Sequence, residues 1–96
     1  MNHYEIMVDI PVFQLNTYEI LLYVESNEGC LKSEIYKHIG FSGQTSVNIV
    51  NNLIESGLLS ESKSGRYNKK SISLTEKGLK ILSLMKSIAD IFSEDP

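Results

Sequence analysis

The stretch that decides the fold runs from Leu31 to Gly78 and reads LKSEIYKHIGFSGQTSVNIVNNLIESGLLSESKSGRYNKKSISLTEKG. In its first half, apolar residues recur three and four positions apart, which indicates two amphipathic helices, over residues 33–39 and 42–56. Only two or three residues separate these helices, as a helix-turn-helix requires. The second half predicts two short strands, over 58–62 and 71–74, which flank an exposed basic hairpin tip.

Two further helices are expected on either side of this stretch. The first follows Asn16 through the sequence TYEILLYVES. Asn16 is a good N-cap residue, and Glu19 three positions later predicts a capping box. The last helix follows Thr75, another good N-cap residue. Within residues 1–12, β-branched and other apolar side chains recur at every second position from Tyr4 to Ile10, a pattern that fits a short strand or extended arm but also an opening helix.

Length and composition indicate one soluble domain. The 96 residues suffice for a single core. We divide the chain into an N-terminal arm (1–12), a core (13–74) and a C-terminal helix (75–93). No apolar run is long enough to predict a membrane span. The single cysteine, Cys30, and an acidic N-terminus without signal-peptide character favour the cytoplasm. Cys30 is more simply a small apolar residue than a redox or intersubunit group.

Charge is distributed unevenly along the chain. The formal net charge of −3 argues against a nucleic-acid binder. Residues 42–80, however, contain six basic and three acidic side chains, and the remainder is strongly acidic. A local basic patch is what attracts a phosphate backbone. The alternative is a solvated loop that happens to be basic.

The helix predicted over 42–56 has an unusual polar face. Its side chains are uncharged and both donate and accept hydrogen bonds, and Asn and Gln suit pairing with adenine in the major groove. A merely solvated face more often carries Glu and Lys, and three Asn residues lower helix propensity. The alternative is compositional bias, because Asn and Ser are common throughout the chain. The candidate base-reading residues are Gln44, Thr45, Asn48, Asn51 and Asn52.

The hairpin tip supplies the other candidate contacts with DNA. Arg66 follows Gly65, and an arginine at such a tip suits a narrow minor groove. Lys63, Lys69 and Lys70 are expected to contact phosphates, which sets affinity and salt dependence but not sequence preference. Together with the amide side chains, this arginine predicts A/T-rich binding sites.

The region from about Asn16 to Met85 resembles the winged helix-turn-helix of small archaeal and bacterial transcription regulators of the multiple-antibiotic-resistance and phenolic-acid-repressor kinds. The most specific matches are VNNLIESGLL (50–59) and SLTEKG (73–78). The resemblance implies an α+β, mainly α fold with a two-stranded wing and a long C-terminal helix. It also implies base-reading roles in the recognition helix and an arginine at the wing tip. One departure is that no Lys or Arg lies between Phe41 and Ser62.

The C-terminal helix is expected to form a homodimer. Its apolar stripe is too wide for one small domain to cover, and an uncovered apolar patch marks a partner surface. The simplest partner is a second copy related by a two-fold axis. The alternative is that the helix folds back over the first helix as ordinary core. The predicted interface residues are Ile81, Leu84, Met85, Ile88, Ile91 and Phe92.

The sequence contains no recognisable catalytic, nucleotide-binding or metal-binding motif. We therefore expect no enzymatic activity, no cofactor and no metal, and no small-molecule effector is identified. The hypothesis from sequence is a sequence-specific double-stranded DNA-binding transcription regulator, with the helix over 42–56 in the major groove and the wing (63–70) on the minor groove or backbone. The alternative is a protein-interaction winged helix within a larger assembly.

Overall fold

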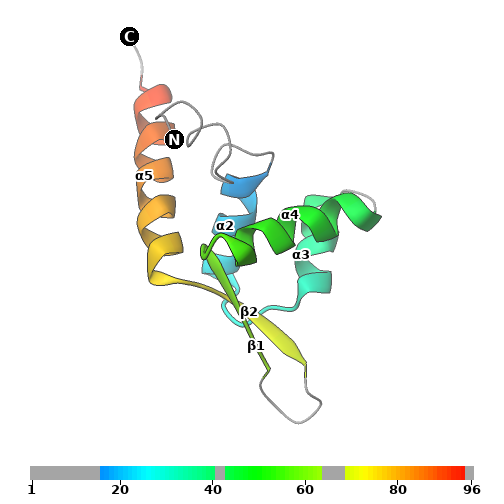
Figure 1. Cartoon of the computed structure of the whole chain (residues 1–96). Helices are drawn as coiled ribbons and strands as arrows, with labels where there is room; N and C mark the ends of the chain where they lie inside the picture. Colours follow the sequence, from blue (N-terminus) through cyan, green and yellow to red (C-terminus); the bar gives the residue numbers. More distant parts are fainter. Residues whose placement is uncertain (1–15, 41–42, 64–68, 95–96) are drawn as a thin grey trace, which may run out of the picture.

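The computed structural model describes residues 16–40, 43–63 and 69–94 (Figure 1). Within these ranges the chain is mainly helical, with one antiparallel pair of strands that extends away from the helices. The elements are α2 (Thr17–Ser26), α3 (Lys32–Ile39), α4 (Gly43–Glu55), β1 (Leu59–Lys63), β2 (Lys70–Leu74) and α5 (Glu76–Phe92).

The observed elements confirm the predicted order, and their bounds differ from the prediction by a residue or two. Between α3 and α4 the chain turns at Gly40, whose φ of 72° is readily adopted by glycine. Thr75 caps α5 as expected, since its side chain accepts a hydrogen bond from the Gly78 backbone N–H. The predicted N-terminal arm (1–12) lies outside the described residues.

The capping box predicted at Asn16 is wrong. Asn16 precedes α2, but its backbone is left-handed, with φ 64°, and its side chain makes no capping hydrogen bond. The Glu19 carboxylate lies instead 3.5 Å from Nε2 of His38 on α3. A left-handed N-cap does not have the extended backbone from which a capping side chain usually reaches the first-turn N–H groups, so the local motif was overridden.

The core surrounds α2, which contacts α3, β2 and α5. Ile20, Leu21 and Val24 form its fully buried face. Positions three and four apart share one face of a helix, so this spacing places all three against the neighbouring elements. The other members of the core cluster are Cys30, Ile35, Ile39, Val50, Leu53, Leu58, Leu59, Ile72 and Leu82.

The wing is tied to the helical core along one edge. β1 and β2 pair in antiparallel register from Leu59 opposite Leu74 to Lys63 opposite Lys70. An isolated bridge adds Cys30 to the other side of Ile72, whose backbone N–H donates to the Cys30 carbonyl oxygen at 2.8 Å. Cys30 is buried there, which agrees with the apolar packing role expected for it.

The end of α4, the start of the wing and the start of α5 meet at one backbone crossing. The Thr75 backbone N–H donates to the Leu58 carbonyl oxygen at 3.2 Å, and the Thr75 hydroxyl donates to the Gly57 carbonyl oxygen. Gly78 lies so close that a β-carbon added to it would be 2.1 Å from the Leu58 carbonyl oxygen. Only glycine fits this crossing without displacement of the backbone.

We expect Gly78→Ala to destabilise the fold by about 1–3 kcal/mol, the usual range for overpacking a tight contact. The loss should exceed the roughly 1 kcal/mol that alanine gains in helix propensity. Urea denaturation measures the difference, with Ser83→Ala at an exposed position of α5 as the control. An unchanged or increased stability for Gly78→Ala would mean that the two backbones can separate at little cost.

Candidate nucleic-acid interface

The exposed face of α4 carries most of the residues that the sequence singled out. Gln44, Thr45, Asn48 and Asn52 are all exposed, whereas Ser46, Val50 and Leu53 are buried on the opposite side. At 3.6 residues per turn, this division produces one polar face along the helix, which is uncharged except for the exposed Glu55 in the last turn. Val47 is only partly buried, so both of its interpretations, core residue or contact with a thymine methyl, stay open.

Two of these side-chain amides form a hydrogen bond with each other. Gln44 Nε2 donates to Asn48 Oδ1 at 2.9 Å, one helical turn along α4. The pair keeps unused hydrogen-bonding groups on both side chains, because each amide carries two donors and an acceptor with two lone pairs. The outer surface of α4 therefore presents preformed donors and acceptors, and its formal charge is confined to the exposed Glu55 at the C-terminal end.

Asn51 has a different environment from the other candidates. It is partly buried, and its Oδ1 accepts a hydrogen bond from Lys32 Nζ at 3.2 Å. Lys32 is the first residue of α3. Sequence reasoning missed Lys32 as part of this surface, because it lies 19 positions from Asn51 and only the packing of α3 against α4 brings them together.

Lys32 also joins the wing to the two helices. Its Nζ lies 2.9 Å from Oε2 of Glu61 on β1, and Oε1 of the same carboxylate is 3.8 Å from Nζ of Lys70 on β2. The side chains of Lys32 and Glu61 are only 28% and 20% exposed, so solvent screens this pair less than an ordinary surface pair. Hydrogen bonding to the Lys32 ammonium is the largest influence on the pKa of Glu61 and lowers it, against the opposing effect of burial.

The wing itself carries exposed cations. Lys63 and Lys70 face each other at the end of the strand register, and Lys69 is exposed just before β2. Lys63, Lys69 and Lys70 thus gather at the distal end of the described strands, as the sequence predicted. Arg66, the predicted minor-groove residue, lies outside the described residues.

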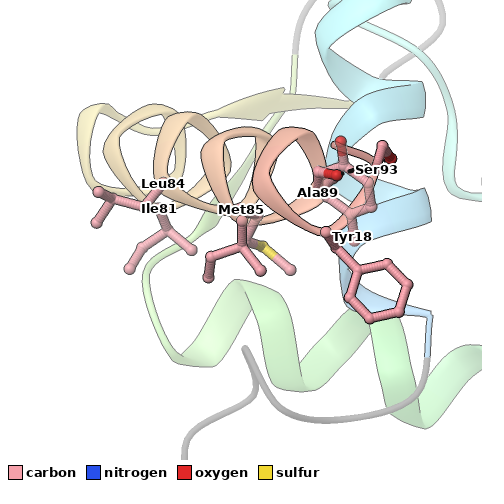
Figure 2. A pocket seen from close by; sticks show the side chains of 8 residues that line it. Tyr18, Ile81, Leu84, Met85, Ala89 and Ser93 are labelled. Atoms are coloured by element: carbon pink, nitrogen blue, oxygen red, sulfur yellow. Dashed lines mark hydrogen bonds between the residues drawn. The ribbon is translucent and has the colours of Figure 1, made fainter. Parts of the chain in front are cut away.

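The other exposed feature is the outer face of α5. Leu84, Ile88, Ile91 and Phe92 are between 63% and 90% exposed, although Leu82 on the opposite side is buried. Figure 2 shows that Ile81, Leu84 and Met85 project from the same side of this helix. The hollow there measures about 600 Å³ and is also lined by Tyr18 from α2. The predicted interface residues therefore do form an apolar surface, of which Ile81 and Met85 also contact the core.

The described part of the chain contains no group of His, Cys, Asp and Glu side chains that could hold a metal ion. Among the helices of that same part, none is both long and apolar enough to cross a bilayer.

Comparison with known proteins shows which solved structures share this fold. No protein-family model and no curated protein matches the chain. Among solved structures, a mutant of MepR from multidrug-resistant S. aureus superposes with a TM-score of 0.77 at 24% identity, over 93% of this chain and 64% of MepR. The transcriptional repressor CouR bound to a 23-mer DNA duplex gives 0.73 at 24% identity, over 83% and 58%. A MarR protein from Peptoclostridium difficile gives 0.68 at 18% identity, over 80% and 51%.

These likenesses establish the winged helix-turn-helix fold that the sequence resemblance implied, with its two-stranded wing and long final helix. The chain spans between about half and two thirds of the length of these structures. S. aureus MepR was also solved in complex with DNA, and that structure superposes with a TM-score of 0.72 at 24% identity, over 83% of this chain and 59% of that chain.

The Lys32–Glu61 pair predicts an acid-dependent contribution to stability. Because the pKa of Glu61 is lowered in the folded state, the stabilisation is fully present above the usual glutamate pKa of about 4.3 and is lost as the pH falls through the lower folded value. We expect Lys32→Met to be less stable than the wild type at neutral pH. Urea denaturation between neutral and acidic pH should show this difference shrinking as Glu61 becomes protonated.

Lys86→Met is the matched control, since it removes a more exposed pair with Glu25. Such surface pairs contribute about 0–1 kcal/mol, so this variant should depend on pH much as the wild type does. A difference between Lys32→Met and the wild type that stays constant with pH would contradict the role assigned to Glu61.

Proposed function

We propose that this chain is a sequence-specific double-stranded DNA-binding transcriptional regulator that acts as a homodimer. In this proposal α4 enters the major groove and the wing contacts the minor groove or the backbone. The activity is one of binding and involves no catalytic step.

The observation that carries the proposal is the amide-rich exposed face of α4, which has no basic residue, beside the basic wing. Gln44, Thr45, Asn48 and Asn52 offer hydrogen-bond donors and acceptors, which is what direct reading of base edges requires. The cations lie on the wing, where contacts with phosphates supply affinity without sequence preference. The division of labour between the two elements matches that of a winged-helix DNA binder. The DNA complexes of MepR and CouR, proteins of the same fold, support this interpretation.

The exposed face of α5 supports self-association. A single copy leaves Leu84, Ile88 and Ile91 in water, and contiguous apolar surface of this kind marks an interface. A second copy is the occupant we propose because the charges at the two ends of this apolar face are opposite in sign. An antiparallel pair of α5 helices would bring the exposed Lys80, near the start of one helix, toward the exposed Glu94, just beyond the end of the other. Two recognition helices would then reach successive major grooves about 34 Å apart.

One observation favours a second candidate function, a protein-interaction winged helix. The hollow on α5 is apolar and open, and it could receive a helix from an unlike protein. The two functions differ in what they require of the wing, because an interaction module that uses α5 does not depend on the lysines of β1 and β2.

We expect the purified protein to enrich a palindrome from random duplex DNA, with about ten base pairs between half-site centres. Asn48→Ala should alter base preference at one position in each half-site, at a cost of about 1–3 kcal/mol on the preferred sequence.

Lys69→Ala and Arg66→Ala should weaken binding, and Lys69→Ala should do so evenly across sequences with a shallower salt dependence. Fluorescence anisotropy at several salt concentrations measures both effects.

Two variants serve as controls for these measurements. Asn27→Ala removes an exposed amide from the end of α2, and Lys86→Ala removes a cation from α5. Neither should change sequence preference, and Lys86→Ala should leave the salt dependence as it is. The absence of any enriched sequence, with weak binding that disappears as salt rises, would reject the regulator and favour the protein-interaction module.

We expect the wild-type protein to sediment at twice the 10.8 kDa mass of one chain. The double variant Leu84→Glu/Ile88→Glu should be monomeric, because it places two charges in the centre of the proposed interface. Both residues are more than 60% exposed in the single chain, so the helical circular dichroism of the variant should persist. Sedimentation equilibrium distinguishes the two states.

Ser83→Glu adds a charge to the same helix outside the apolar face and should remain dimeric. A wild-type protein that is monomeric at micromolar concentration, or a double variant that still dimerises, would exclude this interface.

A further inference from the structure

The ammonium of Lys32 connects three elements of the candidate interface. Lys32 is the first residue of α3. Its ammonium nitrogen donates to Asn51 Oδ1 on α4 at 3.2 Å and lies 2.9 Å from Glu61 Oε2 on β1. Asn51 and the side chains of Lys32 and Glu61 are only partly exposed. The cluster therefore lies at the base of the wing, where the two helices of the helix-turn-helix meet β1.

This contact fixes which way the Asn51 amide is turned. An ammonium group has three donors and no acceptor, so only the oxygen of an amide can face it. The two Nδ2 hydrogens of Asn51 then remain available as hydrogen-bond donors. The amide of Asn48 is less constrained, because its neighbour Gln44 has both a donor and an acceptor and can bond to either end of it.

Adenine and the other bases differ in the hydrogen-bond donors and acceptors that a pairing amide must supply. Bidentate pairing with adenine needs the amide oxygen to accept from N6 and the amide nitrogen to donate to N7. Guanine N7 and O6 and thymine O4 need only a donor. The Lys32 ammonium occupies one lone pair of the Asn51 oxygen and the space beside it, which disfavours the approach of a second donor such as adenine N6. Asn51 therefore matches the second group of bases better than the first.

We infer that Lys32 is a specificity-determining positioning residue that holds the Asn51 amide as a hydrogen-bond donor, so that Asn51 selects guanine or thymine rather than adenine. This inference rests on the proposed DNA-binding function. It differs from the adenine pairing that the residue type alone predicts for Asn51, and it leaves the adenine expectation for Gln44 and Asn48 unchanged.

Glu61 completes the arrangement as the counter-ion of Lys32. A lysine that is paired at 2.9 Å within the protein has its charge neutralised before DNA arrives. Release of counterions from DNA scales with the cations that neutralise phosphates. Lys32 should therefore add little to the salt dependence of binding, although it is a cation beside the recognition helix.

The test compares Lys32→Met, Asn51→Ala and the double variant with the wild type, by selection from random duplexes and by anisotropy titration over a range of salt concentrations. Lys32→Met should shift preference toward adenine at one position in each half-site, by about tenfold. Lys32→Met/Glu61→Gln, which removes both charges of the pair, should leave the slope of log K against log salt as in the wild type. Asn51→Ala should lose discrimination at that same position, and the double variant Lys32→Met/Asn51→Ala should behave like Asn51→Ala because both substitutions act through one amide.

Glu61→Gln separates the orientation of Asn51 from the charge of the cluster. Its amide oxygen can still accept from Lys32, but the negative charge is gone. Binding to all sequences should then strengthen by severalfold with a steeper salt dependence, and the preference at the Asn51 position should stay as in the wild type.

Two results would overturn the inference. One is a Lys32→Met/Glu61→Gln variant that weakens binding evenly across sequences and lowers the salt slope by about one per half-site, which would make Lys32 a phosphate contact. The other is a Lys32→Met variant with the base preference of the wild type at every position.

The wild-type measurement distinguishes this failure from failure of the proposed function. A wild type that selects a sequence while Lys32→Met changes nothing rejects only the role of Lys32. A wild type that selects no sequence rejects the regulator and this inference together.

In the free protein, the side-chain amide resonances of Asn51 report the contact directly, and they should shift in Lys32→Met but not in Lys86→Met.

Discussion

The close crossing of α5 over the backbone of Leu58 is the constraint on which the arrangement of this molecule depends. Gly78 allows the two backbones to approach, and the Thr75 side chain bonds both to its own helix and to the carbonyl oxygen of Gly57. The end of α4, the beginning of β1 and the beginning of α5 are thereby held together. Together with the bridge between Cys30 and Ile72, this junction sets the position of the wing relative to α4 and of the apolar face of α5 relative to both.

The candidate interface separates hydrogen bonding from charge. The sequence of α4 has neither Lys nor Arg, and its exposed side chains are amides, a hydroxyl and the Glu55 carboxylate at its C-terminal end. Positive charge lies on the wing, and the cation nearest to α4, Lys32, is paired with Glu61. In the DNA-binding function that we propose, such a surface obtains little affinity from α4 through phosphates, so affinity would depend on the wing and on the number of copies that bind together. The exposed face of α5 supports the proposal that two copies do so.

Much of the candidate site follows from the sequence because its residues are close together in the chain. Gln44, Thr45, Asn48 and Asn52 share one face of a single amphipathic helix, and the 3.6-residue repeat places them there without knowledge of the fold. The same periodicity identified the uncovered stripe of α5. Asn51 belongs to the same repeat, but its partner Lys32 comes from another helix. No local pattern gives the distance between those two side chains.

The sequence by itself determined the order of the elements, their bounds to within a residue or two and the division of α4 into buried and exposed faces, because these depend on local periodicity and on residues such as Gly40 and Thr75. The capping motif did not predict the left-handed backbone of Asn16, a conformation that asparagine tolerates. Only the tertiary structure decided the contact of Gly78 with Leu58. It also decided the pairing of Lys32 with Asn51 and Glu61. The physical reason is that hydrogen bonds and ion pairs between elements depend on side chains that meet only after the helices and the wing have packed.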